Sequence, residues 1–135
     1  MKIMVPYDGK APSKKALESG VAQAKASGAE LHVVLSFPQK IEVKVEDVEH
    51  LKTAERDLKN LKARLDGEGV NCVTALLTAD VSHGENLVQY AIDKAVDSIL
   101  IGLRKTSKVG KMIFGSTAQY VILHAPCPVT SVKSS

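Results

Sequence analysis

The sequence contains no tryptophan, only two cysteines and few aromatic residues, which make up 4% of the chain. A surface that stacks nucleic-acid bases needs aromatic side chains, and a net charge of +3 is too small to require nucleic acid as a partner. No apolar run approaches the roughly 20 residues of a membrane span, so we expect no membrane association. Cys72 and Cys127 lack CxxC spacing and are expected to be buried free thiols in a reducing compartment.

The chain does have enough apolar residues for one core. Its 135 residues are 44% hydrophobic and 24% charged, which predicts a single domain over residues 1–135 with a solvated surface of mixed charge. Near the start, Asp8 and Gly9 interrupt the first apolar segment too early for a signal peptide. We therefore expect a cytoplasmic protein.

Strand and helix patterns alternate along the whole chain. Strands are predicted at 2–7, 31–36, 70–77, 97–101 and 129–132, and helices at 12–27, 45–66, 82–95 and 116–124. The inward residues expected on the third and fourth helices are Leu87, Val88, Ala91, Ile92, Ala95, Ala118, Val121, Ile122 and Ala125. This order predicts an α/β fold with a doubly wound, five-stranded parallel sheet between two layers of helices.

Two segments allow more than one interpretation. Ile41, Val43 and Val45 alternate with charged residues, which fits a half-exposed strand or an extended loop; we favour the loop because no turn follows. The long helix that starts near Val45 carries an apolar stripe that fits either a coiled-coil partner or a sheet, and packing on the sheet is favoured.

Local signals define helix starts and one sheet edge. Ser82 with Glu85, and Ser116 with Gln119, have the spacing of capping boxes. Pro128 lacks a backbone N–H, which places the last strand at the edge of the sheet. An exposed edge needs to be covered or paired, and a homodimer that joins residues 128–132 of two copies would do so.

The candidate site lies between the fourth strand and the last helix. Residues 102–117 combine three glycines with four cations and end at a helix start. Glycine permits close backbone approach, and a helix N-terminus offers free amide groups and positive potential, so this segment predicts a phosphate site and hence a nucleotide. If the first and fourth strands are neighbours, Asp8 can accept hydrogen bonds from ribose while Gly115, Ser116 and Thr117 hold phosphates.

Other kinds of site lack their sequence signals. Gly110-Lys111 is not a P-loop, because Met112 stands where Ser or Thr is required. The four histidines show no metal-ligand spacing, and Ser116 has no histidine paired to it by motif, so neither a metal site nor a nucleophilic one is expected. A receiver-type phosphoacceptor would need an acidic pair after the first strand, where Asp8 stands alone.

Four segments resemble the universal stress protein family: residues 3–9, residues 96–102, Gly115-Ser116-Thr117-Ala118 and residues 125–129. The match extends over nearly the whole chain. The resemblance implies strand order 3-2-1-4-5, which makes the ends of the first and fourth strands the switch point. It also implies a homodimer through the last strand and, in one branch of the family, ATP bound in this crevice.

The ATP-binding branch carries Gly, two residues, Gly, nine residues and then Gly-Ser/Thr. Gly102 and Gly115-Ser116 are in register, but Lys105 stands at the second glycine, where its side chain either obstructs the triphosphate or supplies an ammonium contact. By resemblance, Leu35 would lie against the base. The full set of implied contacts is Pro6, Tyr7, Asp8, Leu35, Ile101, Gly102, Arg104, Lys105, Gly115, Ser116, Thr117 and Ala118.

Together with the family resemblance, these features imply a cytoplasmic stress-response protein that binds ATP or another adenine nucleotide, with or without Mg²⁺, and acts as a dimeric signalling or regulatory module. No general base is evident near the phosphates, so we expect no enzyme activity beyond slow ATP hydrolysis. The alternative is a dimeric interaction module of the same fold that binds no nucleotide and docks an acidic partner through the basic loop 104–111. Lys105 is the residue that favours this alternative.

Overall fold

The computed structural model describes residues 1–40, 42, 44–105, 112–113 and 115–134. Within these residues there are six strands and four helices, and no helix is long and apolar enough to cross a membrane. The strands are β1 (Lys2–Pro6), β2 (Glu30–Ser36), β3 (Cys72–Leu77), β4 (Ser98–Lys105), β5 (Met112–Ile113) and β6 (Val129–Ser134). The helices are α1 (Ala11–Ser27), α2 (Val45–Gly67), α3 (His83–Asp93) and α4 (Ser116–His124).

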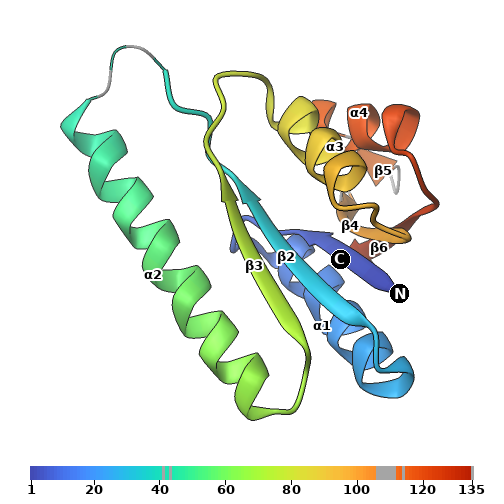
Figure 1. Ribbon diagram of the computed structural model, residues 1–135. Coiled ribbons are helices and arrows are strands. Elements are labelled where there is room, and N and C mark those ends of the chain that lie inside the picture. Colours follow the sequence, from blue (N-terminus) through green and yellow to red (C-terminus); the bar gives the residue numbers. More distant parts are fainter. Residues whose placement is uncertain (41, 43, 106–111, 114, 135) are drawn as a thin grey trace.

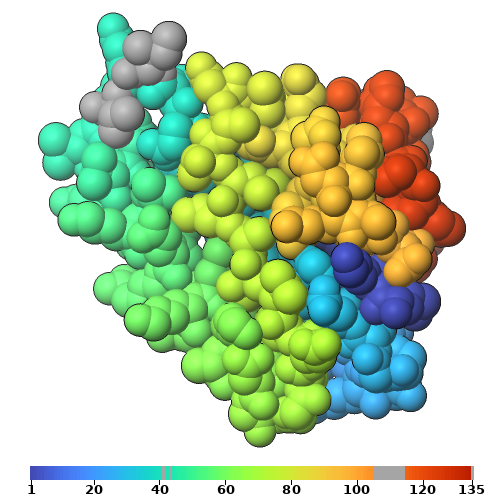
Figure 2. Space-filling model, viewed as in Figure 1, coloured from blue at the N-terminus to red at the C-terminus, as the bar shows by residue number. Residues whose placement is uncertain are grey.

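Five parallel strands form the sheet in the order β3-β2-β1-β4-β6, which confirms the predicted order 3-2-1-4-5 (Figure 1). Helices α1 and α2 pack on one face, and α3 and α4 pack on the other. In the space-filling view, α3 and α4 lie beside each other, and α2 forms the opposite margin of the molecule (Figure 2). The strand order makes β1 and β4 neighbours at the point where the chain reverses its direction of winding.

Strand β4 is longer than predicted. The expected strand ended at Ile101, but the ladder continues through Gly102 to Lys105, because β6 pairs with β4 over residues 99–104. Beyond the end of β1, the short antiparallel strand β5 pairs with Arg104 and Lys105. The sequence analysis ended this strand at residue 101 and did not predict β5, since neither pairing can be read from local periodicity.

The last strand lies at an edge of the sheet, as Pro128 predicted, and among the described residues β6 pairs only with β4. The carbonyl oxygen of Pro128 accepts a hydrogen bond from the Ile99 N–H at 3.0 Å. Backbone groups of successive strand residues point to opposite sides, so those of Thr130 face β4 as those of Pro128 do. Ser131 therefore directs its N–H away from β4.

Most helix ends follow the predicted signals, although α3 ends at Asp93 and not at Ala95. Gly28 ends α1 with φ at 73°, a left-handed conformation that favours glycine. Ser82 caps α3, and its Oγ accepts the Glu85 N–H at 3.1 Å. The prediction that Ser116 caps α4 is wrong, because Gly115 occupies the N-cap position in extended conformation and Ser116 is the first helical residue.

The inward faces of α3 and α4 are narrower than predicted, and Ile92, Ala95 and Ile122 are exposed rather than buried. On α3 the buried face includes Tyr90, whose hydroxyl group contacts His32 beneath the helix. Ile92 therefore lies at the margin of this face and is exposed. Ala95 follows the helix with φ at 52° and belongs to the turn that leads to β4.

Two apolar clusters fill the space on either side of the sheet. The cluster under α1 and α2 includes Leu58, Leu61 and Leu65, which confirms that the apolar stripe of α2 packs on the sheet. The cluster under α3 and α4 includes Leu87, Ala91 and Val121. Each cluster takes alternate residues of the central strands, as expected for a sheet covered on both faces.

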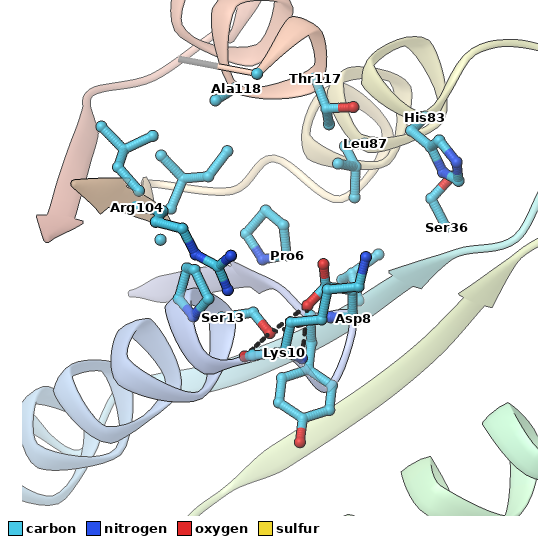
Figure 3. Close-up of a pocket in the computed structure, with 17 residues that line it drawn as sticks. Pro6, Asp8, Lys10, Ser13, Ser36, His83, Leu87, Arg104, Thr117 and Ala118 are labelled. Carbon is cyan, nitrogen blue, oxygen red and sulfur yellow. Dashed lines mark hydrogen bonds between the residues drawn. The ribbon is translucent and has the colours of Figure 1, made fainter. Parts of the chain in front are cut away.

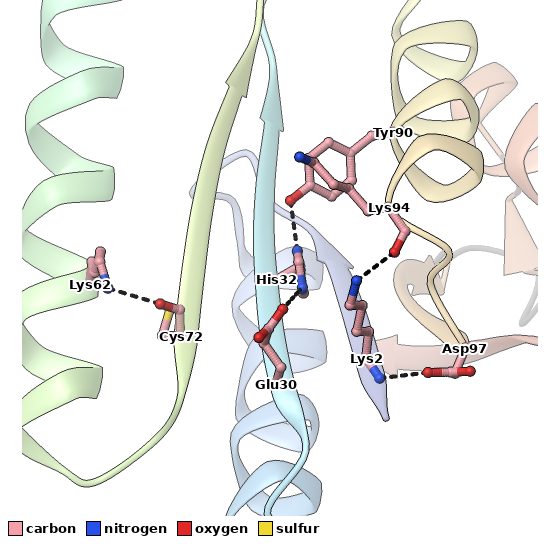
Figure 4. A network of polar contacts seen from close by, with 8 residues as sticks. All are labelled: Lys2, Glu30, His32, Lys62, Cys72, Tyr90, Lys94 and Asp97. Carbon is pink, nitrogen blue, oxygen red and sulfur yellow. Dashed lines mark hydrogen bonds and ion pairs between the residues drawn. The ribbon is translucent and has the colours of Figure 1, made fainter.

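Polar contacts tie the helices to the strands at their margins (Figure 4). Buried His32 on β2 contacts the Tyr90 hydroxyl on α3 through Nδ1 at 2.6 Å and the Glu30 carboxylate through Nε2 at 2.5 Å. Burial raises the pKa of Tyr90, and the nearby Glu30 carboxylate raises it further. Lys62 on α2 donates to the carbonyl oxygen of Cys72 on β3 at 2.9 Å.

Candidate functional site

A cavity of about 610 Å³ opens at the carboxyl ends of β1 and β4, between the start of α1 and helices α3 and α4 (Figure 3). This is the position at which open α/β sheets bind ligands. Nine of the residues that the sequence analysis singled out line it: Pro6, Tyr7, Asp8, Ile101, Gly102, Arg104, Gly115, Thr117 and Ala118. The topology thus brings together segments that are about 95 residues or more apart in the sequence.

Two of the expected contacts, Leu35 and Ser116, lie elsewhere, and the side chain of a third, Lys105, is not described. Leu35 lines a second hollow of about 420 Å³ beside α2, because adjacent residues of β2 face opposite sides of the sheet, and Val34 lines the main cavity in its place. Ser116 is exposed on the first turn of α4 and is not part of the lining. Lys105 ends β4, and its side chain lies outside the described part of the structure, as do residues 106–111 of the basic loop.

Asp8 shapes the turn that leads from β1 into α1. Its Oδ1 accepts the Lys10 N–H at 2.9 Å and the Ser13 hydroxyl at 2.7 Å, and the Asp8 N–H donates to Ser13 Oγ at 3.2 Å. Its other oxygen, Oδ2, accepts no hydrogen bond from a described residue. Asp8 therefore has a structural role in the turn through Oδ1, and this role leaves Oδ2 available.

Gly102 is required by packing. A Cβ atom at this position would lie 2.1 Å from the carbonyl oxygen of Pro12 and 2.9 Å from the backbone nitrogen of Ser13. Real Cβ atoms do not come this close to backbone, so the first turn of α1 rests directly on β4 at this residue. Because Gly102 has no side chain, the start of α1 packs directly on β4. Gly102 is an interior residue of this strand and does not end it.

The N-terminus of α4 faces the cavity, and Thr117 and Ala118 from its first turn line the wall. Gly115 is the N-cap, and its carbonyl oxygen accepts the Gln119 N–H at 3.0 Å. The first turn carries no acidic residue. The unpaired amide groups of a helix N-terminus and the positive end of its dipole favour an anion at this position.

The charge around the cavity is mixed, with a positive excess. Lys10 and Arg104 supply two exposed cations, and Asp8 is the single carboxylate among the described lining residues. Burial raises the pKa of Tyr7 above its ordinary value. The remaining walls are largely apolar.

The sequence analysis missed eight lining residues: Lys10, Pro12, Ser13, Val34, Ser36, His83, Leu87 and Leu103. The missed residues at the start of α1 and Leu103 are close in the sequence to Asp8 and Gly102, which were identified. Proximity along the chain to an identified residue was therefore a usable signal. Ser36 ends β2 and His83 begins α3, and both positions lie at the carboxyl edge of the sheet. The rule that ligands bind at this edge could have identified Ser36, but only the packing of α3 brings His83 beside it.

Comparison with known proteins agrees with this architecture. Residues 1–133 match the model of the universal stress protein family. A universal stress protein of Thermus aquaticus is 32% identical over 134 residues, which cover 97% of each chain. The structure of a universal stress protein from Archaeoglobus fulgidus superimposes with a TM-score of 0.82 at 32% identity and covers 98% of both chains. A universal stress protein from the same organism, solved in complex with dAMP, superimposes with a TM-score of 0.76 at 27% identity, again over 98% of both chains. The chain therefore belongs to the universal stress protein family.

Proposed function

We propose that this protein binds an adenine nucleotide, ATP in the first instance, in the cavity at the ends of β1 and β4. The observation that carries the proposal is the cavity itself, which combines an apolar wall, a free carboxylate oxygen and a helix N-terminus in one space of about 610 Å³. Ligand pockets of this size with a few convergent polar groups are typical of small-molecule sites.

The cavity offers a separate environment for each part of a nucleotide. Val34 and Leu87 provide apolar surface for a base, Asp8 Oδ2 provides an acceptor for ribose hydroxyl groups, and the start of α4 provides amides for phosphates. Lys10 and Arg104 add positive charge next to the phosphate region. The complex of the Archaeoglobus fulgidus relative with dAMP supports the same ligand class.

The protein would act as a nucleotide-responsive module with slow turnover or none. Among the described lining residues, the proposed pose places Asp8 at the ribose and His83 at the β2 end, away from the phosphate region at the start of α4, so neither serves as a general base for phosphate release. Incubation with ATP, with or without Mg²⁺, should release phosphate far more slowly than a dedicated ATPase. Rapid multiple turnover would contradict this part of the proposal.

We further propose that two copies pair through the free edge of β6, as the sequence analysis predicted for residues 128–132. Among the described residues, no strand pairs with the outer side of β6, and such edges are usually paired or covered. A dimer formed in this way would join two sheets edge to edge.

Isothermal titration with ATP, AMP and cyclic AMP tests the binding proposal directly. We expect ATP to bind and Gly115→Val to weaken it about ten-fold or more, because the added side chain would occupy the approach to the α4 amides. A Cβ at Gly115 meets no described atom within 4 Å, so the variant should fold normally. Absence of heat with all three nucleotides would refute the binding proposal, and unchanged affinity of the variant would remove Gly115 from the site.

A further inference from the structure

A small polar cluster lies at the β2 end of the cavity (Figure 3). The Nδ1 atom of His83 lies 3.0 Å from Oγ of Ser36, and both side chains line the cavity. The Asn86 amide donates to the same Ser36 oxygen at 3.1 Å and to the carbonyl oxygen of Ala79 at 3.3 Å. Asn86 is itself buried, with 6% of its surface exposed, so it fixes Ser36 from beneath and leaves the outer side of the pair available to a ligand.

The hydrogen atoms of this pair can be arranged in two ways. Because Asn86 already donates to Ser36 Oγ, one oxygen lone pair and the hydroxyl hydrogen remain. When His83 carries its proton on Nδ1, it donates to Ser36, so the hydroxyl group is a donor toward the cavity and Nε2 is an acceptor. When the proton is on Nε2, Ser36 donates to Nδ1, so Ser36 accepts from the cavity and His83 donates to it.

The position of the pair identifies the part of the ligand it would meet. The strand order places β2 and β4 on opposite sides of β1, so Ser36 and Arg104 lie at opposite ends of the cavity, as Figure 3 shows. The positive charge of Arg104 and the start of α4 favour phosphates at the β4 end. The β2 end, with the apolar side chains of Val34 and Leu87 beside the pair, is then the place for the base.

From this geometry we infer that Ser36 and His83 bind the polar edge of a purine through a donor–acceptor pair that can be inverted. Adenine presents an acceptor at N1 and a donor at its 6-amino group, which matches a Ser36 donor with a His83 acceptor. Hypoxanthine presents the reverse, a donor at N1 and an acceptor at its 6-oxo group, which matches the other proton arrangement. The site is therefore specific for a polar group at position 6 of the purine and tolerates both amino and oxo groups. This inference rests on the proposed nucleotide function.

Titrating the full-length protein with ATP, inosine triphosphate and purine riboside triphosphate tests the inference, since the three ligands differ only at position 6 and N1 of the base. We expect ATP and inosine triphosphate to bind within about three-fold of each other. Purine riboside triphosphate, which lacks the group at position 6, should bind about ten-fold more weakly, which corresponds to one lost hydrogen bond. In His83→Ala and in Ser36→Ala the three affinities should converge, whereas His50→Ala, at an exposed position on α2, should keep the wild-type pattern.

The possible results separate this inference from the function on which it rests. Wild-type protein that prefers ATP over inosine triphosphate by more than about ten-fold would overturn the invertible pair and leave nucleotide binding intact. The same holds if His83→Ala and Ser36→Ala both keep the wild-type pattern. If none of the three triphosphates binds to the wild-type protein, the proposed function fails, and the inference fails with it.

Discussion

A methyl group added at Gly102 would lie 2.1 Å from the carbonyl oxygen of Pro12, and the atoms it meets are backbone atoms that cannot rotate away. Gly102→Ala should therefore push the start of α1 from β4 and lower the free energy of unfolding by about 2 kcal/mol. Urea denaturation measures this change. Gly67→Ala is the matched control, because a Cβ there meets no described atom within 4 Å, and it should leave stability unchanged or raise it by about 0.5 kcal/mol. Equal effects of the two substitutions would contradict the packing explanation.

The two carboxylate oxygens of Asp8 have separate roles, and two substitutions distinguish them. Asp8→Asn keeps an Oδ1 acceptor for the Lys10 N–H and the Ser13 hydroxyl, so the turn should hold and stability should change by less than about 0.5 kcal/mol. The proposed acceptor for ribose is replaced by an amide donor, and ATP affinity should fall about ten-fold.

Asp8→Ala removes both oxygens and should also lower stability by about 1–2 kcal/mol, as two hydrogen bonds to the turn are lost. Thermal denaturation and calorimetric titration of both variants give the two quantities independently. If Asp8→Asn binds ATP as the wild type does, Asp8 is a turn residue only.

At the scale of single residues, the sequence predicted the cavity residues that belong to a family motif or stand at the carboxyl end of a predicted strand. It placed Leu35 in the main site and omitted Val34 and His83, because a motif match assigns positions along the chain but not the face on which each side chain lies. That face depends on the pleat of β2 and on where α3 packs.

Among the helices, the caps give a direct test of how local signals operate. Ser82 Oγ accepts the Glu85 N–H at 3.1 Å, so Ser82→Ala should lower the free energy of unfolding by about 1 kcal/mol. Ser116 has the same spacing from Gln119 in the sequence but lies inside α4, after the Gly115 cap. Ser116→Ala should therefore change stability by less than about 0.5 kcal/mol. Chemical denaturation of the two variants decides the matter, and a cost of about 1 kcal/mol for Ser116→Ala would restore Ser116 as a cap.

The strands show where local reading ends. The apolar run at the start of β4 predicted a buried strand, and the structure contains it. Its extension through Gly102 depends on hydrogen bonds to β6, and its last residues pair with β5. Both partners are distant in sequence or too short to show a period, so no local pattern could predict them.

For the whole molecule, the free edge of β6 leads to a prediction about assembly. Ser131→Pro removes an N–H that points away from β4 and places a proline ring on the outer edge, so it should prevent edge pairing while the fold remains. We expect the wild type to be a dimer and the variant a monomer in light scattering coupled to gel filtration. Thr130→Pro removes an N–H on the side facing β4 and should instead lower stability. A wild-type monomer, or a Ser131→Pro dimer, would contradict pairing through β6.

The sequence by itself determined the fold class, the strand order through family resemblance, and most of the residues at the ends of β1 and β4. These features depend on periodicity, turn residues and motif spacing, which are properties of the chain as written. Tertiary structure alone decided that Gly102 must lack a side chain, that Gly115 rather than Ser116 caps α4, and that Ser36 and His83 meet at the β2 end of the cavity. The first and third depend on the close approach of segments that are far apart in the sequence, and the second depends on the backbone angles at Gly115. These contacts and angles are set only when the helices pack on the sheet.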